Sequence, residues 1–227
     1  MTSTDVTVVL AHGAWADGSS WARVIERLRA QGVRALAAPL PLTSLDDDVA
    51  ALDRTIERAS GPVVMAGHAY GGAVIGAARS EAIKALVYVA ALAPDEGETV
   101  AEVFTRVEPH PKAPQLAPDA HGLIWLPDEA FVTAFAPQAS AEDQAVLAAV
   151  QRPIAPISIM TPVGRPRWRD LPSWYLLAEQ DVMIKAENQR FMAERMGARI
   201  QAHPVDHSPL TTHPDLVAAI ILEAVAG

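Results

Sequence analysis

Short apolar runs alternate along the chain with longer stretches in which apolar residues recur every three or four positions. The apolar runs of the first two-fifths are rich in valine, and they lie at 5–11, 33–41, 62–67 and 84–94. The stretches with helical spacing lie at 21–32, 44–61 and 69–80. Runs this short, apolar throughout and separated by helices, predict parallel strands that are covered by helices on both faces.

The pattern changes between residues 95 and 168, where prolines gather. Eleven of the chain's 18 prolines fall between Pro94 and Pro166, around short helical patterns at 128–136 and 140–150. Such a segment is too long for an ordinary connection, so we expect a small helical cap. The earlier pattern then resumes, with a strand and its following loop expected at 171–181 and again at 198–207, and helices at 186–198 and 213–226. The simplest organisation is one α/β domain over residues 1–227, with a mostly parallel sheet of about six strands and a cap insertion at about 95–168.

Composition narrows the classes of protein and site. The chain has 27 acidic against 18 basic residues, a net charge of −9 and a pI near 5.2, which argues against a nucleic-acid-binding protein and against adhesion to an anionic membrane. The absence of cysteine excludes a disulfide scaffold, a thiolate zinc site, an iron–sulfur cluster and a cysteine nucleophile. Residues 1–13 lack a basic region ahead of an apolar run, and no run is long enough to span a bilayer. We therefore expect a soluble, cytoplasmic protein.

The sharpest local motif is GHAYGG at 67–72, directly between an expected strand and an expected helix. Glycine on both sides of one residue at such a corner is typical of the nucleophile elbow, G-x-S-x-G, in which the central side chain projects above the sheet. The central residue here is Ala69 instead of serine. A plain strand-to-helix turn, with glycines for close helix packing, is the alternative that this motif alone leaves open.

Two later residues fit the elbow interpretation. Asp181 follows a late strand in LAEQDVMI, and His207 follows the next strand in PVDHSPLTTHPDLV. Because ligands bind at the carboxyl ends of strands in open α/β sheets, we expect Ala69, Asp181 and His207 to face one crevice. The order of elbow, acid and histidine along the chain is that of nucleophile, acid and base in α/β-hydrolases.

With these motifs the sequence resembles the α/β-hydrolase superfamily. It is most similar to the branch of small cofactor-free esterases and lyases that includes plant methyl-ester hydrolases, hydroxynitrile lyases and pyrethroid-hydrolase-like proteins. The segments that carry the resemblance are HGAWADGSSW (12–21), GHAYGG, VYVAALAPDEGE (87–98), AEQDVMI and DHSPLTTHPDL. The likeness spans nearly the whole chain and is weakest between about 100 and 165.

The resemblance implies a definite site. His207 would be the general base, with Asp181 orienting its imidazole, and Ala69 would occupy the position of the nucleophile. The backbone N–H groups of Ala14 and Tyr70 would form the oxyanion hole. The substrate would be a small apolar ester, lactone or similar carbonyl compound, and no cofactor or metal is implied. The oligomeric state stays open, with a homodimer among the possibilities.

The candidate substrate-binding residues divide between the early loops and the cap. Those in the loops are Trp15 and His68; those in the cap are Trp125, Phe131 and Phe135. The cap aromatics fit two interpretations equally, as the lining where the cap closes over the crevice or as the cap's own small core. His68, like His12, is expected to brace its loop more than to touch substrate.

Polar residues near the motifs also have simpler structural interpretations. Ser19 or Ser20 is expected to be the N-cap of the helix that begins near Trp21, in preference to acting as a displaced nucleophile. Asp46, Asp47 and Asp48 fit the first turn of a helix better than a metal site. Asp95 is an alternative acid for the base, although APDEGE is more typical of a turn.

A methyl group at position 69 cannot attack a carbonyl carbon, so we expect little covalent acyl transfer. Three explanations of Ala69 remain open from the sequence. The alanine is an engineered replacement of an esterase's serine; or it is natural, in an enzyme whose His207–Asp181 dyad acts as a general base for water activation, lyase chemistry or proton abstraction; or the chain is a non-catalytic ligand-binding protein.

Overall fold

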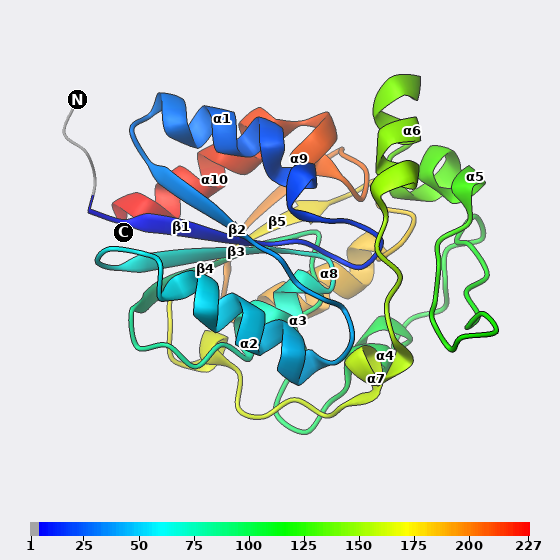
Figure 1. The fold of residues 1–227 in the computed structure, drawn as a ribbon, viewed down its shortest axis with the longest axis horizontal. Coiled ribbons are helices and arrows are strands. Elements are labelled where there is room, and N and C mark those ends of the chain that lie inside the picture. Colours follow the sequence, from blue (N-terminus) through cyan, green and yellow to red (C-terminus); the bar gives the residue numbers. More distant parts are fainter. Residues whose placement is uncertain (1–4) are drawn as a thin grey trace.

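The computed structural model describes residues 5–227 and contains one sheet of six parallel strands in the order β2-β1-β3-β4-β5-β6 (Figure 1). The predicted class, a parallel sheet of about six strands flanked by helices, is confirmed. The strands are β1 (Thr7–Ala11), β2 (Arg34–Ala38), β3 (Val63–His68), β4 (Ile83–Val89), β5 (Ser173–Ala178) and β6 (Arg199–His203).

Helices cover both faces of the sheet (Figure 1). The helices on one face are α1 (Ala22–Ala30) and α10 (Pro214–Ala226); those on the other are α2 (Leu45–Ile56), α3 (Gly71–Gly76) and α8 (Ala186–Arg195). The alternation of side chains along each strand supplies both cores. In β1, Val8 and Leu10 pack with the α1 and α10 side, whereas Val9 and Ala11 pack with the α2 and α3 side.

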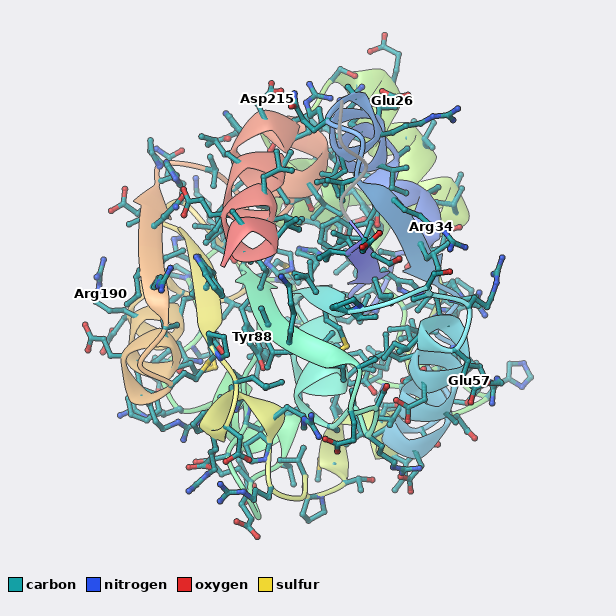
Figure 2. The ribbon with its side chains drawn as sticks, turned by 90° about the vertical axis from the view of Figure 1, so that its left-hand side faces the viewer. Glu26, Arg34, Glu57, Tyr88, Arg190 and Asp215 are labelled. Atoms are coloured by element: carbon teal, nitrogen blue, oxygen red, sulfur yellow. The ribbon has the colours of Figure 1, made fainter. Side chains whose placement is uncertain are left out.

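Burial on both faces explains the unbroken apolar runs of the sequence. Every residue of β1, β3 and β5 is buried, and Tyr88 of β4 lies in the middle of the molecule, while the labelled charged residues lie around the periphery (Figure 2). Each fully buried valine or leucine stabilises the fold by about 1.5–3 kcal/mol relative to an exposed one. The edge strand β2 is half-buried, and accordingly its sequence is less apolar.

The 95–168 segment, between β4 and β5, lies at the carboxyl ends of the strands (Figure 1). Its helices are α4 (Val100–Phe104), α5 (Asp128–Ala130), the π-helical turn η2 (Phe131–Phe135), α6 (Ala141–Val150) and α7 (Pro156–Met160), followed by the 3-10 turn η3 (Arg167–Arg169). Isolated bridges join Ile124 to Pro118 and to Ile154. The segment therefore stands where the sheet's loops gather.

Several boundaries differ from those predicted. Helix α1 is preceded by the 3-10 turn η1 (Gly18–Trp21), whose N-cap is Asp17, accepting a hydrogen bond from the Ser19 N–H. The prediction of Ser19 or Ser20 as N-cap before Trp21 is wrong, because the chain already enters a 3-10 turn at Gly18, three residues before the helical spacing begins. Strand β4 ends at Val89, not Pro94, since the next residue has a φ of +44°.

Three short helices lie outside the sequence prediction: α4, α7 and α9 (Pro209–Thr212). Each has five residues or fewer, too short for a repeating apolar pattern. Helix α4 does carry a capping motif in the sequence, since Thr99 and Glu102 form a capping box. Across residues 5–227, none of the helices has the length and apolar character needed to cross a bilayer.

Candidate active site

The loops that follow β1, β3, β5 and β6 converge at one edge of the sheet. They carry, in order, the His12–Ala14 turn, Ala69, Asp181 and His207. Ala14, Ala69 and His207 line one cavity, and Asp181 lies directly behind His207. The structure thus brings together residues that are nearly 200 positions apart in the sequence.

The turn at Ala69 keeps the strained backbone of a nucleophile elbow. Ala69 has a φ of +48°, in the left-handed region that costs an L-residue about 1–2 kcal/mol. A side chain at Gly67 would place its Cβ 2.5 Å from the Gly71 carbonyl oxygen, and one at Gly71 would lie 2.5 Å from the Ala11 carbonyl oxygen. Both flanking glycines are therefore required by close backbone contacts, not by general flexibility.

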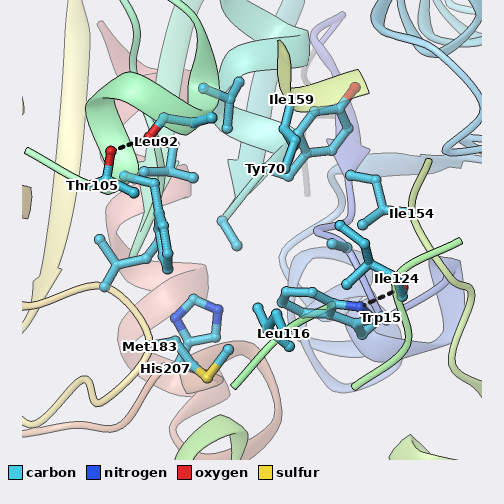
Figure 3. Close-up of a pocket in the computed structure, with 16 residues that line it drawn as sticks. Trp15, Tyr70, Leu92, Thr105, Leu116, Ile124, Ile154, Ile159, Met183 and His207 are labelled. Atoms are coloured by element: carbon cyan, nitrogen blue, oxygen red, sulfur yellow. Dashed lines mark hydrogen bonds between the residues drawn. The ribbon is translucent and has the colours of Figure 1, made fainter. Parts of the chain in front are cut away.

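His207 and Asp181 form a buried hydrogen-bonded dyad. The Nδ1–H of His207 donates to Oδ2 of Asp181 over 2.8 Å, and both side chains are almost fully buried. Donation from Nδ1 leaves Nε2 of the neutral ring as the acceptor. Nε2 makes no hydrogen bond to any residue that the structure describes, and the imidazole faces the cavity (Figure 3).

Asp181 is held by four hydrogen bonds. Its Oδ1 accepts from the N–H groups of Met183 and Ile184 at 2.7 and 2.8 Å, and its Oδ2 accepts from Gln189 Nε2 at 2.8 Å in addition to His207. Sequence reasoning missed Gln189, which also accepts from the Ala178 N–H with its Oε1. Its eight-residue separation from Asp181 is no recognisable motif spacing. The carboxylate is therefore fixed by its own loop and by helix α8.

Two buried histidines pack behind the site. His68 Nε2 donates to the backbone carbonyl of His207 over 2.7 Å, and the two rings lie 4.8 Å apart. His12 Nδ1 donates to the Gly13 carbonyl, 2.9 Å away. Burial lowers the pKa of His68 well below its usual range and that of His12 to about 4, so both rings are neutral near pH 7. Neither ring is among the lining of the cavity.

Two backbone N–H groups beside Ala69 are unpaired. Those of Ala14 and Tyr70 donate to no other residue within the described part of the chain, although both residues line the cavity. Tyr70 is also the N-cap residue of helix α3, where N–H groups lack helical partners. A substrate carbonyl oxygen placed between these residues and Ala69 could accept hydrogen bonds from both N–H groups. Neither N–H group would have to give up an existing hydrogen bond to donate.

The cavity has a volume of about 240 Å³ and an apolar wall (Figure 3). Its lining residues are Ala14, Trp15, Ala69, Tyr70, Leu92, Val100, Ala101, Phe104, Thr105, Leu116, Ile124, Ile154, Ile159, Met183, Ile184 and His207. Polar atoms of the wall are already hydrogen-bonded within the protein: Trp15 Nε1 donates to the Ile124 carbonyl, and the Thr105 hydroxyl donates to the Ala101 carbonyl. Of the described residues that line it, only His207 carries an imidazole, and none carries a carboxylate, an ammonium or a guanidinium group.

The predicted substrate-binding residues divide between the cavity and the cap. Trp15 lines the cavity, as described above. Trp125 does not; the residue is 44% exposed, and its Nε1 donates to Asp119. Phe131 and Phe135 also lie outside the lining; both are fully buried, and their rings lie 5.2 Å apart. Phe135 still touches the site from behind, with its ring 5.2 Å from that of His207.

A buried carboxylate anchors Tyr70 from the far side. The Tyr70 hydroxyl donates to Asp48 Oδ2 over 2.7 Å, and Asp48 Oδ1 accepts from the Leu42 N–H, also over 2.7 Å. Asp48 lies in the first turn of α2, as predicted, but is fully buried while its neighbours Asp46 and Asp47 are exposed. Burial raises the pKa of Asp48 to about 6, from an ordinary value of 3.8.

This raised pKa makes the Asp48→Asn variant a test with a definite sign. The folded state holds the proton more tightly than the unfolded state, so the carboxyl's contribution is fully present below about pH 4 and is lost as the pH rises through 6. The asparagine mimics the neutral acid. Its free energy of unfolding relative to the parent should therefore rise by about 2 kcal/mol between pH 4 and pH 7. Urea unfolding at several pH values measures this difference.

Asp47→Asn provides the matched control. Hydrogen bonds from Ser44 and Thr43 lower the pKa of this exposed neighbour, so its stabilising contribution is present above pH 4 and is lost as the pH falls. The pH dependence of this control should be small and opposite in sign. A difference between Asp48→Asn and the parent that stays constant from pH 4 to pH 7 would show that Asp48 titrates normally.

No cluster suited to a metal occurs in the part of the chain that the structure describes: no three His, Asp or Glu side chains gather as a ligand set. The alternative acid, Asp95, is paired with Arg169 through two 2.8 Å hydrogen bonds, and Arg169 lowers its pKa. The Asp95 N–H donates to Oε2 of Glu98, 2.8 Å away, within the turn that the APDEGE segment predicts. The dyad of His207 is therefore made with Asp181.

Comparisons with known proteins agree with this geometry. The sequence matches the model of the Alpha/beta hydrolase family over residues 8–220. It is 25% identical to the alpha/beta hydrolase nvfD of Aspergillus novofumigatus over 245 residues, covering 96% of this chain and 95% of that protein. The fold is similar to that of polyneuridine aldehyde esterase, with a TM-score of 0.82, 19% identity and coverage of 96% and 98% of the two chains.

Two further solved structures are similar. A pyrethroid hydrolase from Sphingobium faniae JZ-2 has a TM-score of 0.82 and 22% identity, with 98% of each chain covered. A methylesterase from Arabidopsis has a TM-score of 0.79 and 19% identity, with 97% of this chain and 99% of that one covered. Identities this low show a shared fold.

Proposed function

Because the chain belongs to the alpha/beta hydrolase family, we propose that its cavity binds a small apolar ester or lactone and hydrolyses it without a covalent acyl intermediate. One observation carries the proposal: an oriented base, two unpaired N–H groups and a methyl group in place of a nucleophile surround a single apolar cavity. The esterase-type site is complete except for the hydroxyl at position 69.

The proposed reaction is direct attack by water. His207 Nε2 takes a proton from a water molecule while the oxygen of that water bonds to the carbonyl carbon. Asp181 stabilises the imidazolium that forms. The N–H groups of Ala14 and Tyr70 stabilise the negative charge on the former carbonyl oxygen. The tetrahedral intermediate then expels the alkoxide, which takes the proton from His207, leaving a carboxylic acid and an alcohol.

The wall of the cavity supports the choice of a neutral substrate. A carboxylate on the substrate would be buried against isoleucine, leucine and phenylalanine side chains without a cation to pair with. We therefore expect p-nitrophenyl butyrate to be hydrolysed with a kcat/KM about 100-fold or more above that of p-nitrophenyl hemisuccinate, which adds a charged group at similar length. Initial rates of nitrophenolate release measure both values.

The His207→Ala variant serves as the control in the same assay, because nitrophenyl esters also react at surface groups. Only the activity that this variant loses belongs to the site. Equal kcat/KM values for the two esters, after this background is subtracted, would contradict the proposed substrate class.

A further inference from the structure

Both neighbours of His207 in the sequence bond to the same short stretch of the cap. The Ser208 hydroxyl donates to the Phe135 carbonyl over 2.8 Å, and Asp206 Oδ2 accepts from the Gln138 N–H over 2.9 Å. Asp206 and Ser208 are 0% and 1% exposed. The base-bearing loop is therefore fastened to residues 135–138 on both sides of the base; we call these two hydrogen bonds the clasp.

The same stretch of cap also reaches the loop that carries the acid. The side-chain amide of Gln138 donates to Oε1 of Gln180, 2.7 Å away, and Gln180 directly precedes Asp181. Gln138 thus contacts the neighbours of both members of the dyad. A shift of residues 135–138 would move the acid and base loops relative to each other.

Among the residues that the structure describes, Asp206 is held by hydrogen-bond donors and not by a cation. Its Oδ1 accepts from the Thr212 hydroxyl at 2.9 Å and from the Ser208 N–H at 3.2 Å. Burial raises its pKa, as expected for a carboxylate without an ion-pair partner. Loss of a hydrogen-bond donor leaves a buried carboxylate oxygen unsatisfied, which costs free energy. The hydrogen bonds of the clasp are therefore strongly favoured over their broken state.

The stretch that the clasp holds follows directly on the π-helical turn η2, at Phe131–Phe135. Such turns are rare and occur often at functional sites. The turn leaves the Phe135 ring against His207 and the Phe135 carbonyl against Ser208. Phe135 thus contacts the base through its ring and the adjacent residue, Ser208, through its carbonyl.

We propose that Asp206 and Ser208 are positioning residues, which set the geometry of the His207–Asp181 dyad by seating the cap through residues 135–138. The inference rests on the proposed role of His207 as the base. Neither residue lines the cavity, so neither touches the substrate. In this arrangement, the position of the cap and the orientation of the His207 imidazole depend on each other.

Ser208→Ala tests the proposal without any substrate. Proton NMR follows the Nδ1–H of His207 and its pKa, and hydrogen–deuterium exchange follows the backbone of residues 128–140. We expect exchange in this region to become about 10-fold faster or more, together with loss of the His207 Nδ1–H signal or a shift of at least half a unit in the His207 pKa. Asp206→Asn, which keeps the shape and one acceptor, should give the same two changes at smaller size.

Ser158→Ala is the matched control, because Ser158 is also fully buried and its hydroxyl donates to a backbone carbonyl, that of Leu42. This control should leave the His207 signal and pKa unchanged. Faster exchange of the cap without any change at His207, in Ser208→Ala and Asp206→Asn alike, would overturn the proposal, as would no change in either readout. If Ser208→Ala does not fold, Asp206→Asn decides. Neither readout requires turnover of a substrate. The proposal about the clasp can therefore be overturned while the proposed hydrolysis holds, and the reverse.

Discussion

Replacing Ala69 with serine should convert the chain into an esterase that forms an acyl-enzyme. We expect turnover of p-nitrophenyl butyrate to rise by about 10³–10⁶-fold over the parent, the range that separates serine hydrolases from variants lacking their nucleophile. The reason is that the remaining parts are in place. The left-handed backbone of the elbow is already formed, His207 presents an unpaired Nε2 to the cavity, and the N–H groups of Ala14 and Tyr70 are unpaired among the described residues.

Two measurements made together check this expectation. Nitrophenolate release gives the rate, and intact-protein mass spectrometry detects a butyryl group on the Ala69→Ser variant. Adding His207→Ala to that variant is the control, and it should remove both the rate and the adduct. An Ala69→Ser protein that is folded yet neither faster than the parent nor acylated would show that the base or the N–H groups are not poised for acyl transfer.

Replacing Asp181 with asparagine should lower the parent's own turnover by about 10³–10⁴-fold, to the level of His207→Ala. The carboxylate accepts the Nδ1–H of His207 and so keeps Nε2 free to take a proton. An asparagine held by the Met183 and Ile184 N–H groups through its oxygen turns its NH₂ group toward His207. The imidazole must then carry its proton on Nε2, which is the wrong tautomer for a base.

Asp95→Asn is the control for this prediction, because Asp95 is the alternative acid that the sequence offers, in the loop after β4. Its carboxylate is paired with Arg169, so turnover should stay within about twofold of the parent. A loss of turnover in Asp95→Asn with none in Asp181→Asn would mean that the dyad is made differently in solution.

The sequence predicted the sheet and the loops of the site because both depend on local patterns. Buried parallel strands need unbroken apolar runs such as the one at 62–67, and the elbow needs glycines at 67 and 71 because backbone atoms occupy the space of a Cβ. The order of Ala69, Asp181 and His207 then follows from their places after successive strands.

Contacts between distant segments were beyond such patterns. Gln189 supports Asp181 from helix α8, and Asp48 anchors Tyr70 across 22 positions; each looks in the sequence like an ordinary residue of a helix. The aromatic residues of the cap show the same limit. Composition alone does not say whether Phe131 and Phe135 face the crevice or each other, and in the structure they pack against each other outside the cavity lining.

The most direct test of the proposed hydrolysis compares the parent chain with its His207→Ala variant on p-nitrophenyl butyrate. The intact mass of each protein is recorded in the same reactions. We expect the parent to release nitrophenolate over many turnovers without any gain of mass, and the variant to lose about 10³-fold or more of that rate. Equal rates in the two proteins, or a butyryl adduct that accumulates on the parent during turnover, would contradict base-catalysed hydrolysis by His207.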